Sequence, residues 1–278
     1  MGGRDSFNKR PEQGAGSEDY RTSRSGKSYA GHKNFAIPKT STSEIRLNKY
    51  IADCGVCTRR EADTLIEAGA IEVNGVIITE MGKKVSPNDV IKYGGQTLSR
   101  TKAVYFVLNK PKNIDSRPTG GQGQRSVYDL MRGSTKERIA PVGELDRMTS
   151  GVLIFTNDGN MAKKLTHPRL KCHKIYHVTT EKSITAEHMA LLKEGIELKD
   201  GISKVDNIEY VDGSGKSREI GVEISTGKRK IVTRMLEQLG YKILKLDRVS
   251  FAGLNKKNIP RGKYRELSEK EVGFLRML

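Results

Sequence analysis

The 278-residue sequence has no tryptophan, only 3 cysteines, and no long apolar run. A membrane-spanning helix needs about 20 consecutive apolar residues, so the sequence predicts no such helix. The N-terminus also lacks the apolar segment of a secretory signal peptide, which indicates a cytoplasmic protein. In a reducing compartment the few cysteines are not expected to form disulfide bonds.

The cysteine spacing argues against a structural zinc site as well. Cys54 and Cys57 form a Cys-x-x-Cys pair, but no second pair follows, and Cys172 lies far along the chain. Tetrahedral zinc sites take four well-spaced ligands. We therefore predict no bound metal.

What the sequence has in abundance is positive charge. With 50 Lys and Arg against 33 Asp and Glu, the formal net charge is +17. Such an excess favours polyanions, because each neutralised phosphate releases condensed counterions. A nucleic acid is the expected partner. An anionic membrane surface is the alternative, but no basic helix with a large apolar face supports it.

The composition divides the chain into three parts. Residues 1–42 are rich in Gly, Ser, Lys and Arg and hold few large apolar groups. Such a segment cannot bury enough surface to offset its chain entropy, so we predict a disordered basic tail. The tail is either a weak tether for RNA or inert. Residues 43–101 and 103–278 are predicted to form a small and a larger folded domain.

The small domain carries strong local signals. Residues 45–53 predict a short helix, and Thr58 with Glu61 forms a capping box that opens a second helix ending near Gly69. Residues 70–78 contain Asn-Gly between two apolar stretches, the pattern of a tight β-hairpin.

The larger domain is rich in strand signals. Helices are predicted near 159–166, 185–194 and 229–239, and Ser268 with Glu271 forms another capping box before a final helix. Strands interrupted by helices without strict alternation indicate an α+β fold on a mixed or antiparallel sheet. The predicted strands are residues 104–108, 152–156, 175–179, 205–211 and 219–225.

One carboxylate stands out at the turn formed by residues 143–151. Asp146 lies just before residues 152–156, a short apolar run that predicts a buried strand. A carboxylate fixed there, beneath a basic surface, could act as a nucleophile or a base. The alternative is that Asp146 only caps a turn, as Asp often does.

Residues 46–75 resemble the S4-type RNA-binding domain. The similarity rests on the pattern Arg-Leu-Asn-Lys-Tyr-Ile at 46–51, Cys-Thr-Arg-Arg-Glu-Ala at 57–62, and Val-Asn-Gly at 73–75. Two helix N-termini with nearby cations are also suited to binding phosphate. The alternative is that these cations only form a solvated charged face. The resemblance implies that structured RNA contacts Arg46, Lys49, Thr58, Arg59 and Arg60.

The larger domain resembles the bacterial ribosomal-RNA pseudouridine synthases that carry an N-terminal S4 domain. The matching blocks are residues 108–112, 143–159, 174–178, 226–235 and 246–249. The resemblance implies isomerisation of uridine in ribosomal RNA, without a cofactor or metal. We also expect the protein to be a monomer. Asp146 would either attack C1′ of the sugar or remove a proton from the sugar. Tyr176 would stack on the flipped base, and Lys110 and Arg147 would contact RNA.

Two residues depart from the family pattern. Glu144 stands where the family usually has an arginine, and Thr233 replaces the basic residue that would pair with the catalytic Asp. A buried carboxylate that loses its partner costs about 3–5 kcal/mol. Lys230 and Arg234 are four residues apart and share a face if both are helical, so either could compensate.

These departures leave two functional hypotheses. The first is an active synthase, and residues 251–267 resemble more closely the enzymes that act on large-subunit ribosomal RNA. The second is a catalytically impaired paralogue that binds ribosomal RNA and assists ribosome assembly.

Overall fold

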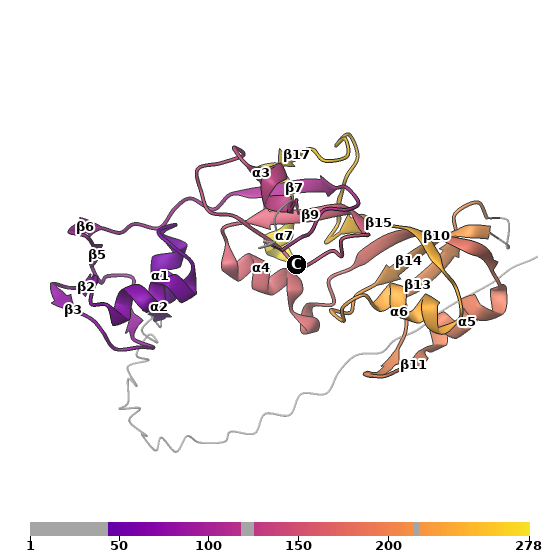
Figure 1. Ribbon diagram of the computed structural model, residues 1–278, viewed down its shortest axis with the longest axis horizontal. Helices are drawn as coiled ribbons and strands as arrows, with labels where there is room; N and C mark the ends of the chain where they lie inside the picture. The colour runs from indigo at the N-terminus through magenta and orange to yellow at the C-terminus, as the bar shows by residue number, and fades with distance from the viewer. Residues whose placement is uncertain (1–43, 118–124, 214–216) are drawn as a thin grey trace, which may run out of the picture. The chain divides into compact units, whose positions relative to one another are not determined.

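The computed structural model describes residues 44–117, 125–213 and 217–278 (Figure 1). The predicted basic tail, residues 1–42, lies outside the described residues.

The small domain begins with a strand rather than with the predicted helix. β1 (Ile45–Arg46) pairs with β4 (Lys84–Val85), and only then does α1 (Leu47–Asp53) begin. The prediction of a helix from residue 45 is therefore wrong for its first two residues, because pairing with a distant strand overrides local helix propensity.

The other local predictions for this domain are confirmed. α2 (Arg59–Glu67) starts at a complete capping box between Thr58 and Glu61. The hairpin joins β2 (Ile71–Val73) to β3 (Val76–Ile77). Its turn residues, Asn74 and Gly75, have φ of 54° and 82°, as a tight hairpin turn requires.

A second small sheet completes the domain. β5 (Ile91–Tyr93) and β6 (Gln96–Thr97) extend the hairpin to a four-stranded sheet in the order β3-β2-β5-β6. Apolar side chains from both helices and from the sheet form one core. Its buried members are Leu47, Ile51, Ala62, Ile66, Ile71, Val73, Val85 and Ile91.

The larger domain is built on one nine-stranded mixed sheet, so the predicted α+β class is confirmed. The strand order is β13-β14-β10-β15-β9-β7-β17, with β8 and β16 paired at its side. Its only parallel pair, among the described residues, joins β15 to β9. The strands are β7 (Tyr105–Lys110), β8 (Ala140–Pro141), β9 (Ser150–Thr156), β10 (Lys174–Ile184), β13 (Asn207–Tyr210), β14 (Ser217–Ile224), β15 (Ile243–Phe251), β16 (Leu254–Asn255) and β17 (Tyr264–Glu266).

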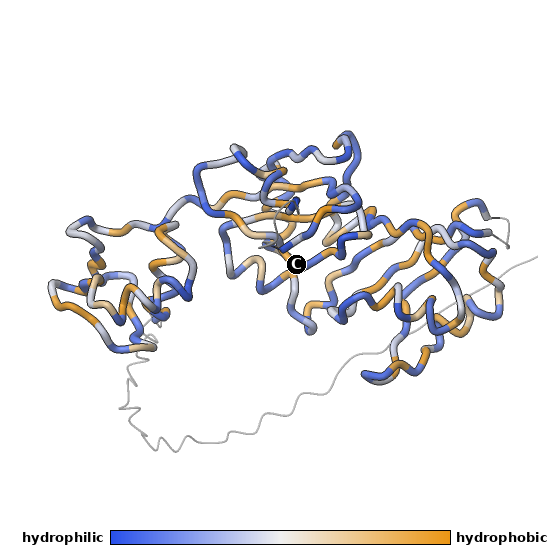
Figure 2. The backbone as a smooth tube through the Cα atoms, in the orientation of Figure 1, coloured by the Kyte–Doolittle hydropathy of each residue, from blue (hydrophilic) through white to orange (hydrophobic). Residues whose placement is uncertain are grey.

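Apolar layers cover both faces of the sheet. Along β9, Leu153 and Phe155 belong to one core, whereas Val152 and Ile154 belong to the other. Successive side chains of a strand point to opposite faces, so an uninterrupted apolar run marks a strand that is buried on both sides. Figure 2 shows these apolar runs along the central strands.

The predicted helices are present. They are α4 (Gly159–Thr166), α5 (Ala186–Glu194) and α6 (Ile231–Gln238), and the predicted capping box at Ser268 opens α7 (Glu269–Met277). The sequence did not predict α3 (Val127–Met131), the 3₁₀ turn η1 (Pro168–Leu170) or the hairpin of β11 (Ile196–Leu198) and β12 (Gly201–Ser203). Within the described ranges no helix is long and apolar enough to cross a membrane.

Candidate active site

A cavity of about 330 Å³ opens where the turn before β9 meets β10, β15 and the start of α6. Asp146, Tyr176, Lys230 and Thr233 line it. Its volume lies at the lower end of the range for small-molecule sites. Residues that are 87 positions apart in the sequence, from Asp146 to Thr233, thus come together at one site.

Asp146 lies in a turn held by buried polar groups. The Thr149 amide donates to the Asp146 carbonyl at 3.0 Å, and Thr149 itself is buried. The Ser116 hydroxyl donates to the carbonyl of Leu145 at 2.8 Å, and the Leu145 amide donates to the Ser116 hydroxyl oxygen at 3.2 Å. The backbone of Asp146 is therefore fixed on both sides, while its side chain remains 28% exposed.

Lys110 holds this turn from beneath, and the prediction that it contacts RNA is wrong. Its side chain is fully buried, so RNA cannot reach it. The ammonium donates to the carbonyls of Thr149 at 2.8 Å and Asp146 at 3.0 Å, with longer bonds to those of Pro111 and Arg147. Burial lowers the pKa of Lys110 to about 8, although the nearby carboxylates of Asp115 and Asp146 partly oppose this.

Gly151 allows β9 and β15 to approach closely behind the turn. It has φ of 110°, and a Cβ atom there would lie 2.1 Å from the Arg248 carbonyl oxygen. No side chain fits at that distance, so only glycine permits the parallel pairing of Gly151 with Arg248.

Tyr176 lies on β10 in the wall of the cavity. It pairs across the sheet with Arg248 on one side and Val222 on the other, and is 9% exposed. The structure thus brings the predicted aromatic residue and the predicted carboxylate to the same cavity.

Lys230 is the cation that the structure places at Asp146. Its Nζ lies 3.5 Å from Asp146 Oδ1. Lys230 precedes α6 and has a left-handed φ of 50°, which is unusual for a residue other than glycine. The predicted helix from residue 229 is therefore wrong at its start, and the expectation that Lys230 and Arg234 share one helical face loses its basis.

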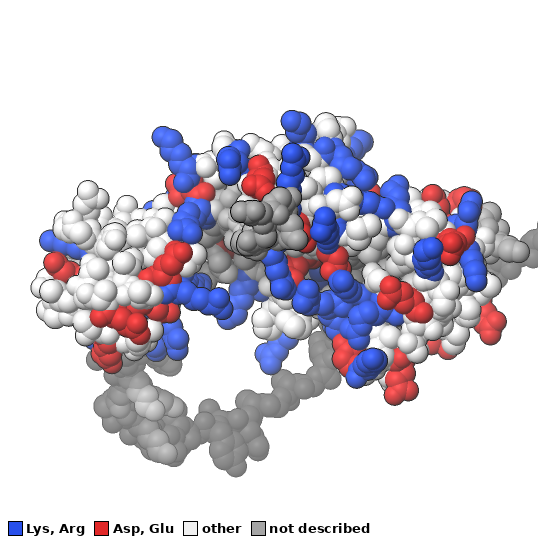
Figure 3. Space-filling model, viewed as in Figure 1, with Lys and Arg blue, Asp and Glu red and all other residues white. Residues whose placement is uncertain are grey.

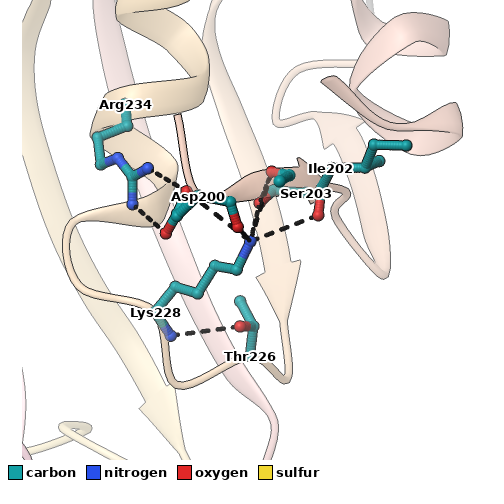
Figure 4. A network of polar contacts seen from close by, with 7 residues as sticks. Asp200, Ile202, Ser203, Thr226, Lys228 and Arg234 are labelled. Carbon is teal, nitrogen blue, oxygen red and sulfur yellow. Dashed lines mark hydrogen bonds and ion pairs between the residues drawn. The ribbon is translucent and has the colours of Figure 1, made fainter. Parts of the chain in front are cut away.

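Arg234 is not brought to Asp146, and its predicted catalytic place is not supported. Its guanidinium forms a bidentate ion pair with Asp200, one bond of which measures 3.0 Å. Figure 4 shows this pair beside Lys228, whose ammonium binds Ser203 Oγ and backbone carbonyls of β12. Both cations fasten the start of α6 to the β11–β12 hairpin.

Glu144 does not face the cavity as an uncompensated negative charge. Arg117 donates to its two carboxylate oxygens at 2.8 and 2.6 Å, and Arg229 Nε lies 3.7 Å away. The bonds from Arg117 lower the pKa of Glu144, with a further contribution from Arg229. Two cations around one carboxylate leave this side of the cavity positively charged.

The remaining predicted RNA contacts are accessible. Arg46, Arg59 and Arg60 are exposed on the small domain, and Arg147 is exposed beside Asp146. Lys49 is half-buried. The Thr58 hydroxyl accepts from the Glu61 amide at 3.3 Å, so it already serves as a helix cap. Figure 3 shows Lys and Arg side chains crowding parts of the surface, with Asp and Glu among them. These RNA contacts stay predictions.

Sequence reasoning placed Lys174 and Arg248 in matching blocks but assigned no role to them, nor to Phe251, and all three line the cavity. Arg248 and Phe251 are nearly fully buried, and the Arg248 guanidinium lies 4.5 Å from the Phe251 ring centre. The adjacent charged residues Asp247 and Arg248 between the apolar residues Leu246 and Val249 were the available signal. No cluster of His, Cys, Asp and Glu suited to a metal occurs in the part of the chain that the structure describes.

Comparison with known proteins agrees with this geometry. Residues 104–238 match the family model described as RNA pseudouridylate synthase, and residues 45–91 match the S4 domain. Ribosomal large subunit pseudouridine synthase B of Bacillus subtilis is 37% identical, over 84% of this chain and 96% of that protein. The chain belongs to the RNA pseudouridine synthases with an N-terminal S4 domain.

Other relatives of this synthase support the same family. An uncharacterized RNA pseudouridine synthase of Aquifex aeolicus is 34% identical over 84% of this chain and 94% of that protein. The dual-specificity RNA pseudouridine synthase RluF of Escherichia coli is 32% identical over 83% of this chain and 78% of its own length. A crystal structure of a pseudouridylate synthase superposes with a TM-score of 0.60 at 27% identity, covering 83% of this chain and 99% of that one.

Proposed function

We propose that this synthase isomerises one uridine of large-subunit ribosomal RNA, with Asp146 as the catalytic carboxylate. The observation that carries the proposal is the convergence of Asp146, Tyr176 and Lys230 on one cavity. The Bacillus subtilis relative, which bears a large-subunit name, supports the choice of RNA.

The chemistry follows from these positions. The bond between C1′ and N1 breaks, the uracil ring turns, and C1′ bonds to C5. Asp146 either bonds to C1′ or removes a proton from C2′. Lys230 places a positive charge 3.5 Å from Asp146 Oδ1, where it can orient the carboxylate. Tyr176 would stack on the base once the base has left its RNA helix or loop.

The basic surface would supply the RNA affinity. The proposed reaction uses no cofactor. Exposed cations of the small domain, such as Arg59 and Arg60, would bind phosphates, and Arg147 would do so beside the cavity. We further propose that a monomer suffices, which light scattering of the purified chain tests.

The test uses unmodified large- and small-subunit ribosomal RNA transcripts labelled with tritium at uridine C5. We expect the wild-type protein to release close to one tritium per large-subunit molecule and none from the small-subunit RNA. The isosteric Asp146→Asn variant should bind the same RNA and release none. Release from the small-subunit RNA instead would contradict the choice of substrate.

The same assay separates the second hypothesis, a non-catalytic ribosome-assembly protein. That hypothesis predicts no release by the wild-type protein despite intact RNA binding. If the Glu144→Arg/Thr233→Arg double variant then gained turnover, the loss would be assigned to those two positions.

A further inference from the structure

The Arg248 guanidinium has one unsatisfied hydrogen-bond donor in the cavity wall. Arg248 is 2% exposed and lines the cavity. Its Nε donates to the carbonyl of Val152 at 2.8 Å, but its Nη2 has no hydrogen-bond partner among the described residues. Buried polar groups are nearly always paired, so a free donor of a buried cation in a cavity indicates a ligand group.

The other cations of the cavity wall are already engaged. The Lys174 ammonium donates to the carbonyls of Thr226 and Cys172 at 3.1 and 3.3 Å. Lys230 lies at Asp146, Arg229 at Glu144, and Lys228 binds the β11–β12 hairpin. Within the parts of the chain that are described, Arg248 is the cation of the cavity wall that keeps a buried donor without a hydrogen-bond partner.

The neighbouring carboxylate on β15 does not serve Arg248. Asp247 points to the opposite face of the strand, where it forms ion pairs with Lys256 and Arg261. Burial lowers the pKa of Arg248, and the nearby Tyr176 oxygen opposes this. Because a guanidinium is not deprotonated in proteins, the cavity holds a permanent, desolvated positive charge beside Tyr176.

We propose that Arg248 is a catalytic residue that stabilises the departing uracil anion through a hydrogen bond from Nη2 to a ring carbonyl oxygen. This inference rests on the proposed isomerisation. When the C1′–N1 bond breaks, its electron pair stays on the ring and spreads over N1 and the carbonyl oxygens. Both routes open to Asp146 produce this anion, so the role of Arg248 does not depend on the route.

The later steps form the new C–C bond and restore Asp146 to its starting state. After the ring turns, the electron pair of the anion forms the C5–C1′ bond, and Asp146 leaves C1′ or returns its proton to C2′. C5 then loses its hydrogen as a proton, and N1 takes up one proton. A fixed donor in a low-dielectric site favours the charge that develops in the transition state more than water does.

The test compares two RNAs with uridine or 5-fluorouridine at the target position. Fluorine withdraws electrons and stabilises the ring anion, so that the reaction depends less on Arg248. Loss of the starting nucleoside is followed in single turnovers by chromatography of nuclease digests, because C5 of the fluorinated base carries no hydrogen and its product keeps fluorine at C5 after the C5–C1′ bond forms. The variants are Arg248→Met, which removes the charge, and Arg248→Lys, which keeps it but moves the donor.

We expect Arg248→Met to slow conversion of uridine about 100-fold. The factor by which it slows conversion of 5-fluorouridine should be at least ten times smaller. Arg248→Lys should show the same trend with a smaller loss, and it carries the test if the Met variant fails to fold. Lys110→Met is the matched control, because Lys110 is also buried but is satisfied by carbonyls. Its loss should be equal on both RNAs.

Equal losses on the two RNAs for the Arg248 variants would overturn the inference and leave Arg248 a packing residue. Wild-type protein that converts neither RNA would overturn the proposed function, and this inference with it. Intact conversion by the wild type with equal losses in the variants overturns the inference alone.

Discussion

The turn that carries Asp146 and the basic segment at residues 228–234 meet at one cavity but are held differently. The turn rests on buried supports, since Lys110 is fully buried and binds backbone carbonyls. The basic segment is held by accessible ion pairs, such as Arg234 with Asp200, whose side chains are 31% and 45% exposed.

The buried contacts make the Asp146 turn rigid, whereas the exposed ion pairs leave the basic segment free to adjust. Buried polar groups are costly to leave unpaired, so the turn keeps one geometry for the Asp146 carboxylate. Exposed ion pairs contribute only about 0–1 kcal/mol each and weaken in salt. Substitutions beneath the turn should therefore affect folding first, whereas substitutions in the accessible ion pairs should affect RNA binding and rate.

The largest effect is expected behind the turn, from Gly151→Ala. A Cβ atom would lie 2.1 Å from the Arg248 carbonyl oxygen, so β9 and β15 must separate. We expect a loss of more than about 4 kcal/mol in unfolding free energy, measured by denaturant titration. Gly221→Ala on β14 is the control, because a Cβ atom there meets nothing within 4 Å. Similar stability of the two variants would contradict the close approach.

Lys110→Met should have the next largest effect, about 2 kcal/mol, because it leaves buried carbonyls without a donor. The pKa of Lys110 falls from 10.5 to about 8 on folding. Between these values the unfolded state binds more protons, so Lys110 makes the wild type more stable as pH rises. We expect the stability difference between wild type and variant to grow from about pH 8 to 10.5. A constant difference would show that Lys110 does not titrate in this range.

The smallest effect is expected at Arg117, at the edge of the cavity. Arg117→Ala removes a cation that binds Glu144 and leaves more negative charge facing RNA. We expect RNA affinity to fall a few-fold and the slope of log affinity against log salt to decrease by about 1. The Arg117→Ala/Glu144→Gln double variant should recover much of the affinity, because it removes the opposing charge too. No recovery would mean that Arg117 binds RNA independently of Glu144.

The sequence predicted what local chemistry determines. The capping boxes at Thr58 and Ser268 and the Asn74-Gly75 hairpin are set by residues a few positions apart. The central strand β15 was missed because Asp247 and Arg248 interrupt its apolar pattern. Their burial depends on Lys256 and on the cavity, which no local pattern reveals.

The candidate site was predictable in part for the same reason. The sequence motif and the family resemblance identified Asp146 and Tyr176, and the structure places both at the cavity. The choice between Lys230 and Arg234 required the tertiary partner Asp200, 34 positions from Arg234. Likewise, the sequence could not reveal that Arg117 neutralises Glu144, or that Lys110 is buried.

The central proposal is that Asp146 is the catalytic carboxylate and that Lys230, and not Arg234, serves it. The most direct test is the single-turnover rate of tritium release from large-subunit RNA by Lys230→Met and Arg234→Met, with RNA saturating. Lys230 lies 3.5 Å from Asp146 Oδ1, so its loss should slow release about tenfold or more, equivalent to about 1.4 kcal/mol of barrier. Arg234→Met should remain within about threefold of wild type. The reverse order of rates would contradict the account.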